Sequence, residues 1–156
     1  MSERLQREIK QQRSFQSLEQ EALLNLLRTA DVIMQRIAAV LKPYGLSHSQ
    51  YNVLRILRGA GADGLACREI GARMITRDPD ITRLLDRIEA RGLVTRTRDQ
   101  KDRRVVTARI TPEGLRILEQ LDGPVEEVDR RQLEHLGERR LRSLIQLLEV
   151  ARGQDR

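Results

Sequence analysis

Apolar residues recur at helical spacing over residues 18–41, where leucine, isoleucine, methionine and alanine return every three or four positions. This pattern predicts a long amphipathic helix that Pro43 and Gly45 bring to an end. Ser47 and Gln50 then have the spacing of a capping box, in which each side chain accepts a hydrogen bond from the other residue's backbone N–H. A second amphipathic helix follows, and its expected buried stripe is Tyr51, Val53, Leu54 and Leu57.

Two shorter helices are expected next along the chain. Residues 65–66 suit a short strand, and residues 68–74 suit a third helix. Asp78 is a good N-cap for a fourth helix, and Pro79 fits a first helical turn because its missing N–H has no partner there. Gly92 ends this helix at a position where a left-handed C-cap costs little.

The hydrophobic period changes from helical to alternating after this fourth helix. Residues 94–98 and 105–110 are rich in β-branched side chains and flank a charged turn over residues 99–104. Two such runs joined by a polar turn predict a β-hairpin with a basic tip.

Helical spacing returns after the hairpin and continues to the end of the chain. Thr111-Pro112 is typical of a helix start, and Gly123-Pro124 predicts a kink in the helix that follows. A last helix is expected over the apolar positions of residues 141–150. At the other end, residues 1–16 are polar and are expected to form a frayed arm or a helical extension.

The order of elements is therefore four helices, a hairpin and two helices. This order predicts a mainly α fold with a small β-hairpin wing, divided into a winged helix-turn-helix lobe and a helical dimerisation lobe. We expect the DNA-binding domain to span residues 46–111. The helical dimerisation region is expected over residues 1–45 and 112–156.

The charge of the chain favours a polyanionic partner. Lys and Arg number 29 against 23 Asp and Glu, so the net charge is +6 and the pI is about 10.4. Only two Tyr, one Phe and no Trp are present, which disfavours single-stranded nucleic acids because those are usually held by aromatic stacking. Apolar stretches are too short for a membrane span, and no signal-peptide core is visible. The single cysteine, Cys67, suits a reducing compartment, so a cytoplasmic protein is expected.

The polar side of the fourth helix is the first candidate for DNA contact. Its apolar positions cluster on one side, and the opposite side presents threonine, arginine and aspartate. Arginine reads guanine through two hydrogen bonds in the major groove, and threonine meets a thymine methyl or a phosphate. The alternative is a solvated helix face on which Arg83 and Asp86 pair with each other. The candidate DNA-binding residues of this segment are Arg77, Pro79, Thr82, Arg83, Asp86 and Arg87.

The hairpin tip is the second candidate. A two-stranded ribbon cannot bury its tip, so basic residues there face solvent or a partner, and arginine suits a narrow minor groove. We expect Asp102 to hold the Arg104 guanidinium in place by a charge-assisted hydrogen bond. The alternative is a charged turn that only protects the edge of the hairpin. The candidate wing residues are Arg96, Arg98, Lys101, Asp102, Arg103 and Arg104.

The run Asp78-Pro-Asp-Ile-Thr-Arg-Leu-Leu-Asp-Arg-Ile-Glu-Ala-Arg-Gly-Leu-Val, followed by Asp102-Arg-Arg and Thr111-Pro-Glu-Gly, closely resembles the MarR family of bacterial transcriptional regulators. The likeness covers about residues 18–151, and the family's Asp-x-Arg wing motif maps onto Asp102 and Arg104. The resemblance implies a homodimer on double-stranded DNA, in which the first and last helices intertwine with a partner subunit.

The same resemblance implies a pocket for a small aromatic or phenolic effector between the two lobes. Residues of the first two long helices and their connection would line this pocket, although methionine and tyrosine at helical spacing are more often core residues. The candidate pocket residues are Met34, Ile37, Tyr44, His48 and Tyr51.

Other functions find less support in the residues. No catalytic constellation, metal-ligand spacing or phosphate loop is present, so we expect no enzyme activity, no metal and no cofactor. A winged helix used only for protein interaction or dimerisation remains an alternative, as does a redox sensor based on Cys67. Arg68 beside this cysteine would favour its thiolate, but a lone cysteine near apolar residues is more often a small buried hydrophobe.

Overall fold

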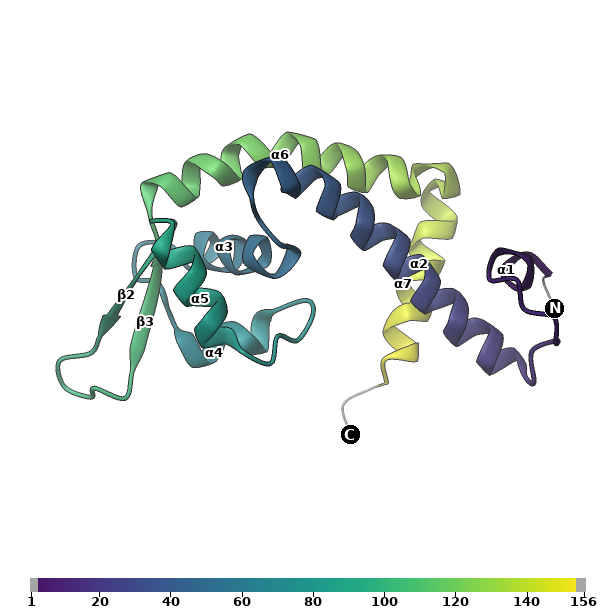
Figure 1. Cartoon of the computed structure of the whole chain (residues 1–156), viewed down its shortest axis with the longest axis horizontal. Helices are drawn as coiled ribbons and strands as arrows, with labels where there is room; N and C mark the ends of the chain where they lie inside the picture. The colour runs from purple at the N-terminus through teal and green to yellow at the C-terminus, as the bar shows by residue number, and fades with distance from the viewer. Residues whose placement is uncertain (1–2, 154–156) are drawn as a thin grey trace. The chain divides into compact units, whose positions relative to one another are not determined.

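The computed structural model describes residues 3–153, and Figure 1 shows the order of its elements. Two compact units, Met1–Arg36 and Ile37–Arg156, divide the chain, and the second helix contributes to both. The elements are α1 Glu3–Glu8, α2 Leu18–Leu41, a 3₁₀ turn Lys42–Tyr44, α3 His48–Ala60, β1 Leu65–Ala66, α4 Cys67–Arg73, α5 Ile81–Ala90, β2 Val94–Arg98, β3 Val106–Ile110, α6 Pro112–Leu133, a 3₁₀ turn Glu134–Leu136 and α7 Gly137–Ala151. The predicted order is confirmed from α2 onwards, and α1 lies in the segment where an arm or a helical extension is expected.

The N-terminal unit consists of α1 and most of α2. Leu5 and Phe15 are buried, so the polar segment before α2 carries two apolar anchors. An Arg4–Glu8 ion pair of 3.0 Å lies along α1. The expectation of a helical extension at the N-terminus is therefore confirmed for residues 3–8.

The core of the second unit forms around α3. Its predicted capping box is present, because the Ser47 N–H donates to Gln50 Oε1 at 3.0 Å and the Gln50 N–H donates to Ser47 Oγ at 3.1 Å. The four predicted stripe residues of α3 are all buried. They pack in one cluster with residues of α5, the sheet and α6, including Leu85, Ile88, Val94 and Leu118.

The helix α5 begins two residues later than the sequence suggests. Asp80, not Asp78, is its N-cap and accepts a hydrogen bond from the Arg83 N–H at 2.9 Å. The Asp78 side chain accepts from the Asp80 N–H at 2.9 Å, so it forms the turn that precedes the cap. Pro79 consequently lies in this turn and not in the first turn of the helix, because a second aspartate two residues on offers the same capping chemistry.

The C-terminal end of α5 follows the prediction. Gly92 has a φ of +71°, and its N–H donates to the Glu89 carbonyl at 2.8 Å. The Leu93 N–H donates to the Ile88 carbonyl at 3.0 Å, which completes a Schellman motif. This turn directs the chain straight from α5 into β2.

The predicted hairpin belongs to a three-stranded antiparallel sheet of order β1-β3-β2. Leu65 pairs with Ala108 on one side of β3, and Arg96 pairs with Ala108 on the other. Gly64 lies so close to β3 that an added Cβ would be 2.3 Å from the Ala108 carbonyl oxygen. The sheet therefore joins the start of α4 to the wing.

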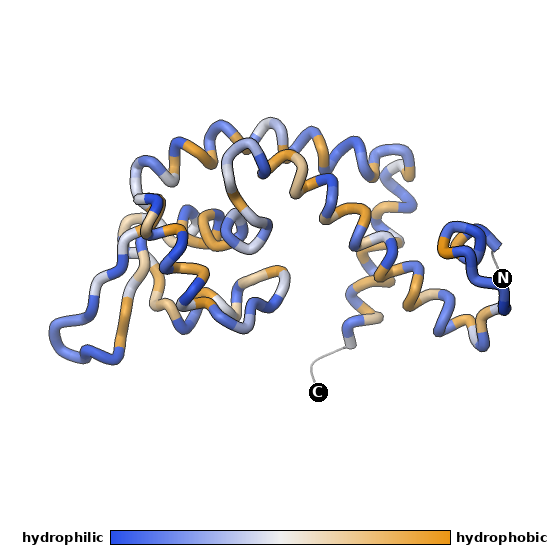
Figure 2. The backbone as a smooth tube through the Cα atoms, in the orientation of Figure 1, coloured by the Kyte–Doolittle hydropathy of each residue, from blue (hydrophilic) through white to orange (hydrophobic). Residues whose placement is uncertain are grey.

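The long helix α6 begins at the expected Thr111-Pro112 and runs unbroken through Pro124 to Leu133. Thr111 is its N-cap, and its hydroxyl accepts from the Gly114 N–H at 3.1 Å and donates to the Gly92 carbonyl at 2.6 Å. No residue of α7 is buried, although hydrophobic positions recur along this helix (Figure 2).

Candidate nucleic-acid interface

The helix α5 divides into a buried side and an exposed side, as its sequence predicts. Leu84, Leu85 and Ile88 are buried in the core. Thr82, Arg83 and Arg87 are exposed, and none of their side chains has a hydrogen bond or ion pair within residues 3–153. Their polar groups are therefore available to a partner.

The turn before α5 carries two further candidates of this segment. Arg77 and Pro79 are exposed and lie ahead of the helix, not on it. Asn52 of α3 anchors this connection, because its Oδ1 accepts a hydrogen bond from the Ile75 N–H at 2.8 Å. Arg77 and Pro79 therefore flank the N-terminus of α5.

Asp86 pairs with Arg96, and Arg96 also pairs with a third residue, Glu89. The Arg96 guanidinium from β2 donates to Asp86 at 2.5 Å and to Glu89 at 2.6 Å and 3.0 Å. The side chain of Arg96 is 20% exposed, whereas that of Asp86 is 58% exposed. Asp86 thus pairs across to the strand, and the helical pairing with Arg83 considered from sequence does not form. Arg96 is held against α5 and is not displayed at the hairpin tip.

Two aspartates shape the turn at the tip of the wing. Asp99 Oδ1 accepts from the backbone N–H groups of Lys101 at 2.7 Å and Asp102 at 2.9 Å, and these bonds lower the pKa of Asp99. Asp102 Oδ1 accepts from the Arg104 N–H at 3.0 Å. The Val105 N–H donates to the Asp102 carbonyl at 3.0 Å, which closes the turn.

The role expected for Asp102 is corrected by this geometry. Its carboxylate contacts the backbone of Arg104 and makes no ion pair with the guanidinium in the described part of the chain. A backbone bond at two-residue spacing is the usual Asx turn, which forms locally without restricting a long side chain. Asp102 therefore orders the loop from which Arg104 projects.

The side chains at the tip are exposed cations. Lys101, Arg103 and Arg104 have no side-chain hydrogen bond or ion pair among the residues that the structure describes. Arg98 is also exposed, and its Nη1 donates to the Arg103 carbonyl at 3.1 Å across the turn. The loop thus holds its backbone in a fixed conformation and leaves three positive side chains to solvent.

Three residues of this region were missed by the sequence analysis. Glu89 receives the Arg96 guanidinium, Asp99 organises the tip, and Arg109 ties the sheet together through bonds to the Thr97 hydroxyl at 2.9 Å and the Ala62 carbonyl at 3.2 Å. Asp99 had a usable signal in its three-residue spacing from Asp102. The partners of Glu89 and Arg109 depend on contacts between distant segments.

The candidate effector residues are divided between the two units. Met34 belongs to the N-terminal unit and is half-buried. In the second unit, Tyr51 is buried in the core cluster, and Ile37 and Tyr44 pack against it. The His48 Nδ1 is buried without a hydrogen-bond partner in the described chain, and burial lowers the pKa of this histidine.

Tyr51 also lines a hollow of about 340 Å³ between α3 and α6. Arg55, Asp122, Val125, Glu126 and Asp129 complete its walls. Arg55 lies over the Tyr51 ring with its Cζ 5.9 Å from the ring centroid. Apart from Tyr51, no candidate effector residue lines this hollow among the residues described.

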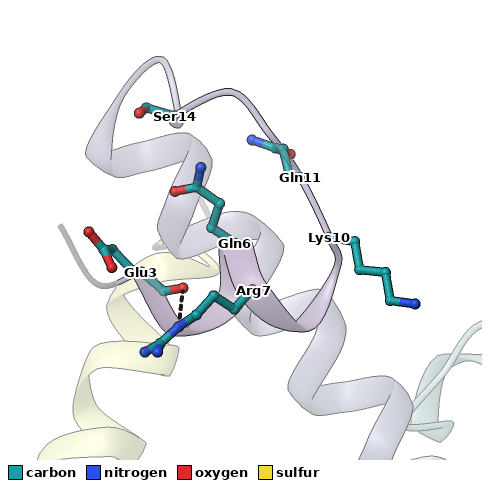
Figure 3. A pocket seen from close by; sticks show the side chains of 6 residues that line it. All are labelled: Glu3, Gln6, Arg7, Lys10, Gln11 and Ser14. Atoms are coloured by element: carbon teal, nitrogen blue, oxygen red, sulfur yellow. Dashed lines mark hydrogen bonds between the residues drawn. The ribbon is translucent and has the colours of Figure 1, made fainter.

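Another hollow, of about 440 Å³, lies in the N-terminal unit and is shown in Figure 3. Its wall is polar, and the Arg7 guanidinium in it donates to the Glu3 carbonyl at 3.4 Å. The lining residues are Glu3, Gln6, Arg7, Lys10, Gln11 and Ser14. None of the residues that the sequence singles out for a site is among them.

Cys67 is half-buried at the start of α4. Burial raises the pKa of its thiol, and the positive charge of Arg96 opposes this effect only in part. A raised thiol pKa reduces the thiolate fraction at neutral pH. The geometry therefore gives little support to the redox-sensor alternative.

The helix α5 has an exposed face, α4 packs against α5, and a basic hairpin follows α5 directly. This arrangement is that of a winged helix-turn-helix DNA-binding protein. Comparison with known proteins gives the same class of protein. Residues 44–105 match the MarR family model. The regulator PrsX of Escherichia coli is 34% identical over 104 residues, which cover 66% of this chain and 63% of PrsX.

Solved structures extend the likeness to nearly the whole chain. A MarR transcription factor from Planctomyces limnophilus is 44% identical, with a TM-score of 0.69, and the match covers 88% of this chain and 99% of that one. CouR from Rhodococcus jostii RHA1, solved with p-coumaroyl-CoA, is 28% identical, with a TM-score of 0.74 and coverage of 91% and 99%. The chain belongs to the MarR family of winged helix-turn-helix transcriptional regulators.

Family membership confirms the predicted class of function. These proteins are DNA-binding regulators of transcription and not enzymes. The chain spans less than two thirds of the length of PrsX, so the activity of that whole protein does not carry over directly. Among residues 3–153, no helix has the length and apolar character needed to cross a membrane.

Proposed function

We propose that this chain is a sequence-specific regulator that binds a pseudo-palindromic operator as a homodimer, with α5 in the major groove and the wing in the adjacent minor groove. One observation carries the proposal: Thr82, Arg83 and Arg87 are exposed and unpaired on α5 within the described residues, and the wing that follows presents three unpaired cations. Guanidinium groups without internal partners are suited to base edges and phosphates.

The two reading elements have different tasks in this proposal. Arg83 would read a base through its bidentate guanidinium, and Arg104 would enter the minor groove from the ordered wing turn. Lys101 and Arg103 would meet phosphates, which position the protein without carrying sequence information.

Apolar surface that a single chain leaves uncovered supports the homodimer. Ile145, Leu147 and Val150 of α7 are 55%, 66% and 70% exposed, and no residue of α7 is buried. Leu23 and Leu27 of α2 are exposed as well. Surfaces of this kind mark interaction sites, and a second copy satisfies both helices at once.

A small effector would act on this dimer. The support is the relative CouR, whose structure holds p-coumaroyl-CoA, together with the buried and unpartnered Nδ1 of His48. We propose an aromatic or phenolic ligand that contacts Tyr44, His48 and Tyr51 and changes the affinity for DNA. Isothermal titration of the dimer with such compounds, repeated with His48→Phe, tests this part.

The experiment for the main proposal is selection of bound sequences from a random duplex pool. An inverted repeat with half-sites about 10 base pairs apart is expected, because two-fold symmetry of the protein requires it in the site. Arg83→Ala should relax the preference at one base and cost about 1–3 kcal/mol. Selected sequences without an inverted repeat would contradict the binding of DNA by a homodimer.

Sedimentation tests the dimer independently of DNA. At micromolar concentration we expect a species of twice the 18.0 kDa chain mass. A lone 18.0 kDa species would show that the exposed faces of α2 and α7 have another role.

A further inference from the structure

Arg96 connects α5, the helix proposed to enter the major groove, to β2, the strand that leads into the wing. The Arg96 N–H donates to Glu89 Oε1 at 2.9 Å, and its Nε and Nη2 donate to Glu89 Oε2 at 3.0 Å and 2.6 Å. The same Nη2 donates to Asp86 Oδ1 at 2.5 Å. Arg96 thus uses four hydrogen bonds to hold two carboxylates that lie three residues apart on α5.

This contact joins α5 to β2, the strand that leads into the wing turn. Arg96 lies in β2 opposite Ala108 of β3, and the wing turn begins at Asp99, only three residues further on. The Arg96 side chain is 20% exposed, so water competes weakly for its hydrogen bonds. Charge-assisted bonds of this kind are stronger than neutral ones, and the planar guanidinium also fixes their direction.

We propose that Arg96 is a positioning residue for DNA recognition, which fixes the wing turn at a defined distance and angle from α5. The inference rests on the proposed function, because it assumes that helix and wing read DNA together. In this role Arg96 touches no DNA, in contrast to its expected place among the contacting wing residues. Its bonds to Asp86 and Glu89 hold the wing turn so that it contacts the minor groove while α5 contacts the adjacent major groove.

Electrostatics adds a second consequence. Asp86 and Glu89 are the acidic residues of α5, and both accept from Arg96. A duplex that approaches α5 therefore meets Arg83 and Arg87 beside carboxylates that are already paired. On charge alone, removal of either carboxylate should strengthen DNA binding. The positioning role predicts weaker DNA binding instead.

The test compares four variants of the full chain with the parent on the selected operator and on the random duplex pool. Arg96→Met removes the guanidinium and keeps a long stem, and Glu89→Gln removes one charge with little change of shape. Asp86→Asn does the same for the second acceptor. Arg116→Met is the matched control, because Arg116 also pairs with a carboxylate, Glu113, but on α6.

We expect Arg96→Met to bind the operator about 10-fold or more weakly, a loss comparable with that of one good base contact. The preference at base pairs read by the wing should fall, while the preference at base pairs read by α5 should persist. The slope of log affinity against log salt should change to the same extent in Arg96→Met and in Glu89→Gln, because both substitutions release the wing that carries Lys101 and Arg103 and neither removes a phosphate contact of its own. Glu89→Gln should weaken binding too, and Arg116→Met should differ from the parent only slightly.

Other results would overturn the inference in distinguishable ways. A salt slope smaller by about one unit in Arg96→Met but not in Glu89→Gln would identify a direct phosphate contact of Arg96. An equal loss on every sequence, together with a lower unfolding midpoint in both Arg96→Met and Glu89→Gln, would identify a role in folding alone. Tighter binding by Glu89→Gln and Asp86→Asn would show that only charge matters. Failure of the parent to select any sequence would instead refute the proposed function.

Discussion

Gly114 offers a quantitative test of how the DNA-binding unit is packed. This glycine is buried in the first turn of α6, where an added Cβ would lie 2.4 Å from the Leu93 carbonyl oxygen and 2.7 Å from Ile110 Cγ1. The Leu93 carbonyl already accepts from the Thr111 N–H at 3.0 Å, so it cannot retreat without weakening that bond. Overpacking of this kind costs about 1–3 kcal/mol.

Gly123 in the same helix is the matched control. An added Cβ there meets nothing within 4 Å, and alanine in a helix is favoured over glycine by about 0.5–1 kcal/mol. We therefore expect Gly123→Ala to be more stable than the parent and Gly114→Ala to be less stable. The two variants should differ by about 2 kcal/mol, a difference of several degrees in midpoint temperature for a chain of this size.

Urea unfolding followed by far-UV circular dichroism measures this difference, since the chain has no tryptophan for fluorescence. The slope m should be unchanged, because neither substitution alters the surface exposed on unfolding. Gly114→Ala as stable as Gly123→Ala would refute the packing of α6 against the turn between α5 and β2.

Three further outcomes are expected from the same structure. Asp102→Ala should weaken operator binding because the Arg104 backbone N–H loses its acceptor, the Asp102 carboxylate, whereas Asp102→Asn keeps an acceptor oxygen and should bind at least as tightly as the parent; tighter binding by the alanine variant would contradict the role of the turn. Arg58 holds the pKa of Asp122 below its usual range, so this pair stabilises the native state above the unfolded pKa of about 3.9 and loses its effect as pH falls through the native value. Asp122→Asn should therefore lower the unfolding free energy near pH 7 by about 1 kcal/mol or less and have no effect in acid, and a pH-independent difference would argue against this linkage. Burial raises the pKa of the Cys67 thiol, so its alkylation by iodoacetamide at pH 7 should be slower than that of free cysteine, a rate that mass spectrometry can follow.

Local patterns were sufficient to predict most of the elements. The capping box of α3 and the glycine C-cap of α5 depend on neighbouring residues only, and the structure confirms both. The two strands of the wing follow from their alternation and β-branched residues in the same way, although β3 begins at Val106 and not at Val105. These features need no knowledge of distant contacts.

The sequence-based predictions are wrong or incomplete where two residues offer the same local interaction, or where a contact joins distant segments. Asp78 and Asp80 offer the same cap, and the sequence does not distinguish a helix that starts with Pro79 in its first turn from one that starts after it. The pairing of β1 with β3 joins segments about 40 residues apart, so the hairpin alone could be predicted.

The candidate site shows the same division between near and distant contacts. Thr82, Arg83 and Arg87 are exposed because the helical period places them opposite the core, so their position follows from the sequence. The partner of Asp86 does not follow, because Arg96 reaches it only once β2 packs beside α5. Residue type predicted two charged groups near DNA, and only the fold shows that they bind each other.

The most direct test of the account is the affinity of the full chain for its selected operator relative to a scrambled duplex of the same composition, measured by fluorescence anisotropy at about 150 mM salt. Specific DNA-binding proteins discriminate between such duplexes by about 10³-fold or more. We expect a ratio of that size, which should fall in Arg83→Ala and in Arg104→Ala while the slope of log affinity against log salt for the scrambled duplex stays negative. Equal affinity for both duplexes would contradict the central claim that α5 and the wing read sequence.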